Sequence, residues 1–257
     1  MCDWSALGTE LDLWGAVGRT ATLWWRDDDA GPEDRALARL LELGARLGVP
    51  LAVAAVPAAL AAATAARLRE ADGVDVLQHG YAHRNHARPG ERKNEFGDHR
   101  PLEDMLGEIK AGRTRLTERL GGLALPVFVP PWNRMSDQLL VGFGPAGLTG
   151  LSALGPRPRA IPVDGPKQVN VHVDLVAWRN GRRFVGTAAA LEATIGHLRA
   201  RREGREDRVD PEEPTGLLTH HMVQDEAAWA YVARFIETTR DHPAVRWVSA
   251  RDAFGLP

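Results

Sequence analysis

Gln78-His79-Gly80-Tyr81-Ala82-His83-Arg84-Asn85-His86 is the stretch around which the rest of the sequence is organised. It follows a short apolar run at residues 74–77 that is typical of a buried strand. Residues four apart lie on one face of a helix, so a strand that opens into a helical turn would let His79 and His83 reach one divalent ion. The pair alone is equally consistent with surface histidines, and the interpretation therefore depends on what the other strands carry.

Length and composition fit a single α/β domain. The chain has 257 residues, 44% of them hydrophobic, which suffices for one domain over residues 1–257 with its core at about 20–255. A formal net charge of -2 offers no basic field to nucleic acid or to an anionic membrane. Cys2 is the only cysteine, so no internal disulfide can form, and residues 1–5 lack the pattern of a signal peptide. These features favour a cytoplasmic protein that binds no nucleic acid.

We expect no membrane span. The longest uncharged run, residues 49–66, is about long enough to cross a bilayer, but Pro50 and Pro57 interrupt it and alanine dominates it. It fits better as a buried strand that turns at Pro57 into an alanine-rich helix.

Strand-like and helix-like segments alternate along most of the chain. Strand patterns cover residues 21–25, 51–56, 74–77, 127–129, 216–219 and 245–249, with further candidates near 148–151 and 169–176. One helical pattern begins near residue 32 and includes Leu47, a second follows the strand at 51–56 and ends near residue 70, and others cover about 101–120, 187–201 and 225–240. The alternation predicts parallel strands with a functional site at their carboxyl ends. A Pro/Gly-rich loop spans residues 155–166, and the charged loop at 201–214 could be a lid, a partner surface or a disordered segment.

Polar residues follow several of these strands directly. Residues 26–29, Arg-Asp-Asp-Asp, come after the first strand, the histidine stretch follows the third, and His220 and His221 follow the strand at 216–219. A barrel or closed sheet would gather them on one rim. One carboxylate and two imidazoles form a catalytic type of metal site, because positions stay open for water and substrate. With a second carboxylate as base and a histidine as acid, these are the parts of a metal-assisted amide hydrolase.

The order of these segments resembles the polysaccharide deacetylases of carbohydrate esterase family 4, also called the nodulation-factor deacetylase homology domain. The resemblance implies a distorted (β/α) barrel, for which we expect about seven parallel strands. The family's first motif, Thr-Phe-Asp-Asp-Gly, is similar to residues 26–30. In one register Asp28 is the catalytic base and Asp29 a metal ligand, and in the other Asp27 is the base and Asp28 the ligand.

The second motif, His-Ser/Thr-x-x-His, is similar to residues 79–83 and implies that both histidines are metal ligands, with glycine in place of the hydroxyl residue. The third motif, Arg-Pro-Pro-Tyr-Gly, is similar to residues 129–133. It implies that one wall of the substrate groove and a backbone N–H for the oxyanion come from Pro131, Trp132 and Asn133. The family arginine that orients the catalytic carboxylate is replaced by Val129. Either Arg26 or Arg134 takes its place, or the role is absent.

The fourth motif has a loose counterpart in residues 172–178, which include Asp174, and the fifth, Leu-x-His, is resembled by residues 218–220. The resemblance makes His220 the general acid and His221 its reserve at the substrate site. It also implies one divalent metal ion, with zinc first and cobalt, nickel or manganese as alternatives.

The function expected from these residues is removal of an acetyl group from an N-acetylated sugar, an oligosaccharide or a related small amide, with metal-bound water as nucleophile. Two alternatives stay open. One is a metal-independent hydrolase of cyclic amides or imides on the same fold, and the other is a catalytically silent carbohydrate-binding protein. Trp24 and Trp25 are expected to pack in the core rather than to bind sugar.

Overall fold

A parallel sheet forms the centre of the molecule. The computed structural model describes residues 3–33, 35–157, 165–179, 181–204 and 209–257. In the sheet, neighbouring strands follow the order β6-β5-β4-β3-β2-β1-β10-β7, β11 pairs with the start of β1, and every pairing is parallel. The strands are β1 (Ala21–Ala30), β2 (Leu51–Ala55), β3 (Val74–His79), β4 (Ala124–Val129), β5 (Gly150–Leu151), β6 (Lys167–Gln168), β7 (Val173–Asp174), β10 (Thr215–Thr219) and β11 (Val245–Trp247).

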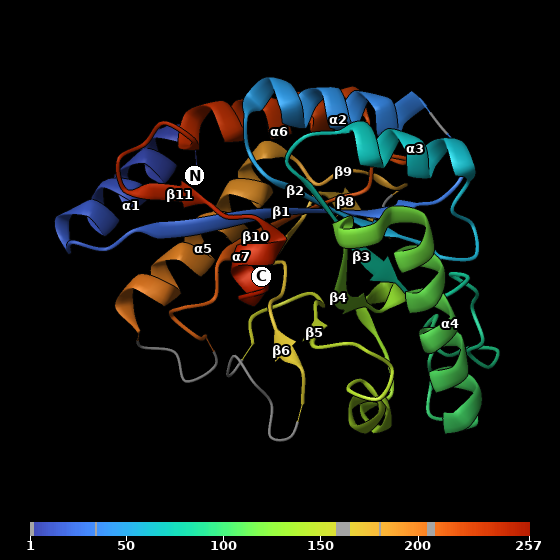
Figure 1. Cartoon of the computed structure of the whole chain (residues 1–257). Coiled ribbons are helices and arrows are strands. Elements are labelled where there is room, and N and C mark those ends of the chain that lie inside the picture. Colours follow the sequence, from blue (N-terminus) through green and yellow to red (C-terminus); the bar gives the residue numbers. More distant parts are fainter. Residues whose placement is uncertain (1–2, 34, 158–164, 180, 205–208) are drawn as a thin grey trace.

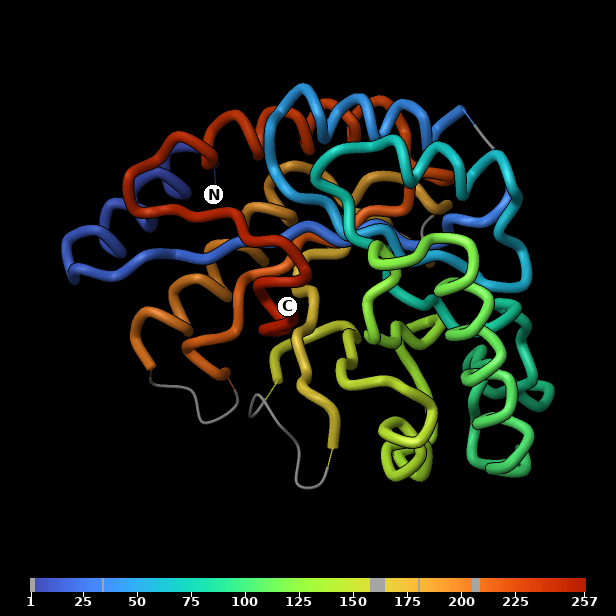
Figure 2. Tube along the Cα trace, viewed as in Figure 1, coloured from blue at the N-terminus to red at the C-terminus, as the bar shows by residue number. Residues whose placement is uncertain are grey.

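One segment, residues 167–174, joins the two ends of this sheet. Its first part, β6, pairs with β5, and Val171 N–H continues this pairing by donating to the Ala153 carbonyl over 3.0 Å. Its last part, β7, pairs with β10, and His172 N–H donates to the Gly216 carbonyl over 2.8 Å. The strands therefore curl into the distorted (β/α) barrel expected from the sequence. Figure 2 shows β1, in blue, crossing the middle of the molecule beside the orange chain of β10.

Helices cover the outer face of the barrel. Figure 1 shows α2 and α6 side by side along one flank and α1 and α5 on another, and α4 packs beside β4 at the right of the view. Their bounds are α1 (Trp4–Ala16), α2 (Arg35–Leu47), α3 (Ala62–Glu70), α4 (Leu102–Leu120), α5 (Thr187–Glu203) and α6 (Glu226–Thr239), whereas α7 (Ala250–Phe254) packs against the interior side chains. Short 3₁₀ turns are η1 (Gly121–Leu123), η2 (Pro131–Asn133) and η3 (Asp137–Gly142), and β8 (Val176–Ala177) pairs antiparallel with β9 (Arg183–Phe184).

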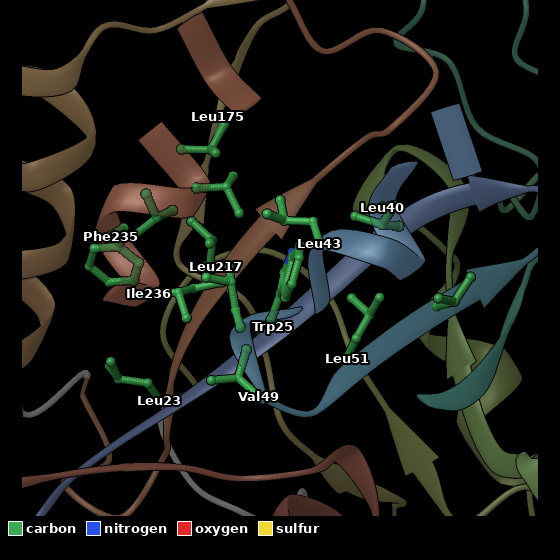
Figure 3. Close-up of a cluster of buried hydrophobic side chains, with 14 of the residues drawn as sticks. Leu23, Trp25, Leu40, Leu43, Val49, Leu51, Leu175, Leu217, Phe235 and Ile236 are labelled. Atoms are coloured by element: carbon green, nitrogen blue, oxygen red, sulfur yellow. The ribbon is translucent and has the colours of Figure 1, made fainter. Parts of the chain in front are cut away.

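Side chains of the strands alternate between the outside and the inside of the barrel. Trp25 packs outside the barrel against α2 and α6, as Figure 3 shows with Leu40, Leu43, Phe235 and Ile236. Trp24 faces the interior, whose apolar filling includes Phe254 of α7. Both indoles are buried and hydrogen-bonded, Trp24 to the Asn170 carbonyl and Trp25 to the Thr219 hydroxyl. Because side chains alternate along a strand, Arg26 and Asp28 share the interior face with Trp24, and Asp27 shares the outer face with Trp25.

Three sequence expectations need correction. The first strand does not end at the acidic cluster but runs through it to Ala30. No helical turn follows His79, because Gly80 and His83 adopt positive φ angles of 57° and 53°, which an α-helix does not contain. Helix α5 continues to Glu203, and Arg201, placed at the start of the charged loop, is a buried helical residue.

Parts of two predicted loops, residues 158–164 and 205–208, lie outside the described residues. Among the helices that the structure describes, none is both long and apolar enough to cross a membrane.

Candidate metal and active site

The acidic cluster changes direction at a bulge near the end of β1. Asp27 is level with Val53 of β2, but Ala30 is level with Ala55, so β1 contains one extra residue between them. Asp29 takes a φ of 79°, which is unusual for a residue with a side chain. In a regular strand Asp28 and Asp29 would point to opposite faces. Here Asp28 contacts Arg26 inside the barrel, and Asp29 contacts His79 at the end of β3.

Three ligand atoms converge at this bulge. The Nε2 atoms of His79 and His83 lie 3.1 Å and 3.3 Å from Oδ1 of Asp29. His79 is buried at the end of β3, while His83 and Asp29 are partly exposed. The group therefore has a side open to solvent, as a catalytic metal site requires.

The tautomer of His79 fits a metal ligand. Its Nδ1 lies 3.0 Å from the Val129 carbonyl, which can only accept, so the proton of the neutral ring is on Nδ1 and Nε2 carries a lone pair. That lone pair faces a carboxylate oxygen of Asp29. The two electron-rich atoms repel each other unless both bind the same cation. Burial lowers the pKa of His79, but the charges of Asp28 and Asp29 outweigh burial and raise it above its ordinary value. Without a metal, a protonated His79 ring can donate from Nε2 to Asp29, and this hydrogen bond and charge hold the pKa of Asp29 well below its usual range although burial acts to raise it.

Asp28 is held by Arg26, one of the two arginines considered in place of the arginine missing at Val129. Arg26 is fully buried and donates from Nε to Oδ1 at 2.9 Å and from Nη2 to Oδ2 at 3.0 Å. Its remaining donors reach the Ser152 hydroxyl at 2.6 Å and the Asn133 side-chain oxygen at 3.0 Å. Arg134 instead donates to the Lys93 carbonyl, so of the two arginines considered at this position Arg26 is the one that contacts Asp28.

Asp27 faces the opposite side of β1. Its Oδ2 accepts hydrogen bonds from the Thr219 hydroxyl at 2.6 Å and from the His221 backbone N–H at 3.0 Å, and its Oδ1 pairs with Nδ1 of His221. Asp27 and His221 are almost completely buried. This buried pair fastens β1 to the end of β10, on the face of the strand opposite Asp28. His221, expected at the substrate site, lies in this pair.

His220 lies on the opposite wall of the site, beside the ribbon of β8 and β9. Its Nδ1 is 3.9 Å from Oδ1 of Asp174, and its ring meets the Trp178 indole edge-on with centroids 4.7 Å apart. Asp174 also accepts from the Trp178 indole N–H at 2.8 Å, and burial raises the pKa of its carboxyl. The loose fourth motif therefore supplies the neighbours of His220.

The third motif forms the wall beside the metal ligands. Pro131 is buried, and Trp132 packs against His83 with ring centroids 4.4 Å apart. Trp132 and Asn133 both take positive φ angles, 55° and 53°, which turn the chain sharply at the end of β4. The structure thus places Trp132, expected in the groove wall, in contact with a proposed metal ligand.

Glu95 is a site residue that the sequence motifs did not identify. It is buried, and its carboxylate accepts backbone N–H groups from Tyr81 at 3.3 Å, Ala82 at 2.8 Å and Arg84 at 3.3 Å. These residues surround His83 in the loop. The only available signal was an acid close behind the histidines in an otherwise polar loop.

A second group of possible metal ligands, His172, His197 and Glu213, lies buried near the start of β10. The Gly216 N–H donates to Nδ1 of His172 at 2.9 Å, so the neutral ring carries its proton on Nε2, which points at Glu213 from 3.3 Å. A metal on that nitrogen would require an imidazolate. Both Glu213 oxygens already accept backbone N–H groups, from Asn170 and Arg157. The group is a structural network that holds the chain before β10 against the barrel.

Comparison with known proteins identifies the fold. No protein-family model matches the sequence, and no curated protein matches it. Among solved structures, a protein from Mycobacterium smegmatis assigned as a polysaccharide deacetylase superposes with a TM-score of 0.64 and 19% identity over 91% of this chain and 88% of that one. A family 4 acetyl xylan esterase from Clostridium thermocellum, solved with a cobalt ion, gives a TM-score of 0.54 and 18% identity over 92% and 93% of the two chains.

A mutant of a family 4 pseudoenzyme with restored activity gives a TM-score of 0.59 and 12% identity, over 91% of this chain and 68% of that one. The molecule is thus an α/β barrel with a carboxylate and histidine cluster on one rim. More particularly, it has the polysaccharide deacetylase fold of carbohydrate esterase family 4. Since a neighbour of this fold is a pseudoenzyme, activity has to be argued from the side chains.

Proposed function

We propose that this protein is a metal-dependent deacetylase that hydrolyses the amide of an N-acetylated sugar or a related small compound. The observation that carries the proposal is the convergence of Asp29, His79 and His83 beside an Asp28 carboxylate that Arg26 holds at both oxygens. Asp29, His79 and His83 would hold one divalent ion. Zinc is the first choice for two imidazoles and a carboxylate, and cobalt, nickel or manganese suit the same ligands.

A divalent ion at this site lowers the pKa of water toward ~7 and polarises the acetamide carbonyl. Asp28 is the proposed base that takes a proton from the attacking water. Arg26 uses one lone pair of each Asp28 oxygen, which leaves the others to accept that proton. The backbone N–H of Trp132 is the proposed donor to the developing oxyanion.

His220 is the proposed acid for the departing amine. It follows β10, the strand that pairs with the Asp28 strand β1, and its Nδ1 lies 3.9 Å from a carboxylate oxygen of Asp174. Trp178 packs against the ring and shields this proton from bulk water. In this proposal Asp28 and His220, at the ends of the neighbouring strands β1 and β10, act as base and acid on the same acetamide.

The proposal is tested by acetate release from N-acetylglucosamine and its short oligomers. The protein is first stripped with a chelator and then assayed with and without added zinc. Activity that disappears on stripping and returns with zinc supports the proposal. Activity that persists after stripping would favour a metal-independent amide hydrolase, and sugar binding without acetate release would favour a silent carbohydrate-binding protein.

A further inference from the structure

Four cationic side chains gather beside the proposed site. Arg134 follows the Trp132 turn directly, and its guanidinium donates to the Lys93 carbonyl at 3.2 Å. The Lys93 ammonium lies 5.9 Å from the centre of the Trp132 ring, which in turn packs on His83. Arg92 precedes Lys93 in the chain, and partial burial, with the charges of Arg92 and Arg179, lowers the pKa of Arg134.

These four residues come from three separate segments. Arg92 and Lys93 lie in the loop behind the metal ligands, Arg134 follows β4, and Arg179 follows Trp178 on the opposite wall. Among the residues that the structure describes, none of the four forms an ion pair, whereas the other clustered arginines Arg100, Arg157 and Arg202 each pair with a carboxylate. Like charges held together without a counter-charge repel each other, and an anionic ligand would relieve this repulsion.

Each wall combines an aromatic ring with a cation. Trp132 lies next to Lys93 and Arg134 on one side, and Trp178, which is 43% exposed, precedes Arg179 on the other. Aromatic rings pack on sugar or base faces, and guanidinium groups bind the oxygens of phosphates and carboxylates with paired hydrogen bonds. Building on the proposed deacetylase function, we infer that the substrate is an N-acetylated sugar bearing an anionic group, such as a phosphate, which Arg134 and its cationic neighbours bind.

Kinetics with matched substrates test this inference. Acetate release is compared for N-acetylglucosamine, N-acetylglucosamine 1-phosphate and N-acetylmuramic acid, which carry no charge, a phosphate and a carboxylate. The expected result is a kcat/KM at least about tenfold higher for the phosphate or carboxylate compound, with the advantage shrinking as salt rises. Preference for one of the two anions identifies the group. Equal kcat/KM for all three compounds would overturn the inference.

Two variants separate the anion site from the proposed chemistry. Arg134→Gln should remove the advantage of the anionic compound and leave turnover of the neutral one unchanged. Arg246→Gln is the matched control, since Arg246 is exposed and pairs with the start of β1, away from the carboxyl ends of the strands. A loss for both substrates in Arg134→Gln would contradict the inference.

If no compound is hydrolysed, calorimetric binding of N-acetylglucosamine 1-phosphate still decides the question. If the wild type binds this compound and Arg134→Gln does not, the anion site is supported although the deacetylase function is not. No binding to the wild type would overturn the anion site as well.

A different observation, the three hydrogen bonds to Glu95, carries a second inference. Where the related motif has a hydroxyl residue this chain has Gly80, and a Cβ on Gly80 would lie 2.1 Å from Oε2 of Glu95. The missing side chain thus makes room for the carboxylate. Glu95 is itself fixed, since Arg100 donates to its backbone carbonyl at 3.0 Å. We propose that Glu95 is a positioning residue that sets the loop conformation in which His83 reaches Asp29.

Metal affinity, measured by competition with a chromophoric chelator, tests this role directly. Glu95→Gln replaces one acceptor oxygen with a donor amide and should weaken zinc binding by about 10- to 100-fold. Glu91→Gln is the control, because Glu91 is an exposed carboxylate of the same loop. If Glu95→Gln does not fold, Glu95→Asp keeps the charge but shortens the reach, and it should weaken zinc binding in the same direction.

Wild-type zinc affinity in a folded Glu95 variant would overturn the positioning role. A wild-type protein without zinc affinity would instead overturn the proposed function, so the two failures are distinguishable.

Discussion

Arg26 and Asp28 lie two residues apart on the inner face of β1, and the arginine binds both oxygens of the carboxylate at 2.9 Å and 3.0 Å. The two side chains are essentially excluded from solvent. A paired carboxylate of this kind keeps one orientation, so a single strand supplies both the proposed base and the group that orients it.

Replacement of Arg26 should impair catalysis more than metal binding. Arg26→Lys keeps the charge but cannot bind both oxygens, and we expect kcat to fall by about 100-fold as Asp28 loses its orientation. Zinc content should stay near one ion per chain, because Arg26 does not contact the proposed ligands. Arg26→Ala should also lower stability by about 3–5 kcal/mol, since it leaves a buried carboxylate unpaired. Undiminished kcat in a folded Arg26→Lys protein would remove Arg26 from the account.

The choice between Asp27 and Asp28 as base leads to a paired prediction. Asp28→Asn should reduce kcat by about 10²- to 10⁴-fold and leave the zinc content unchanged. Asp27→Asn should instead lower the melting temperature, because Asp27 joins β1 to Thr219 and His221 in the core. Acetate-release assays beside thermal melts distinguish the two. A stable Asp27→Asn protein without activity, with Asp28→Asn still active, would reverse the assignment.

The buried network around Glu213 predicts a pH dependence of stability. Burial raises the pKa of Glu213 from its ordinary value of 4.5 to about 7. Below about pH 4.5 the carboxyl is protonated in the folded and unfolded chains, and its contribution to stability is complete. As the pH rises toward 7 the unfolded chain ionises first, so stability should fall by about 3 kcal/mol between pH 4.5 and 8.

Glu213→Gln should remove this fall. Burial lowers the pKa of His172 to about 3, so that histidine destabilises the fold only as the pH drops below 6.5, in the wild type and the variant alike. Urea unfolding of both proteins at pH 5, 6, 7 and 8 measures the difference. If the free energies of unfolding run parallel over this range, the proposed titration of Glu213 is wrong.

Local pattern was sufficient to predict parallel strands with a site at their carboxyl ends, whereas the distorted barrel was implied by the family resemblance. The alternation of apolar strands with amphipathic helices depends on residues close in sequence, and strand ends in a parallel barrel meet on one side. The sequence therefore indicated which segments would meet at the site, and the structure does bring Asp28, Asp29, His79, His83 and His220 to that side. The resemblance of motifs added the division of roles, which stays a prediction.

The features that sequence reasoning missed depend on long-range pairing or unusual backbone angles. The bulge that turns Asp29 toward the histidines exists only relative to β2. The expected helical turn was wrong because spacing of four residues also occurs in a loop, and here Glu95, twelve residues beyond His83, fixes that loop. The contact between Arg26 and Asp28 was easier to predict, because residues two apart in a strand point to the same face. Only the hydrogen bonds of Arg26 to Ser152 and Asn133 show that this face is the inside of the barrel.

The measurement that tests the central claim most directly is the metal content of the purified protein. After removal of loosely bound ions and incubation with zinc, mass spectrometry is applied to the wild type, to the His79→Ala/His83→Ala variant and to a His99→Ala control. His99 is exposed and lies outside the ligand group. We predict one ion per chain in the wild type and the control, and none in the double variant. A wild type that holds no zinc, or a double variant that keeps it, would contradict the proposed metal site.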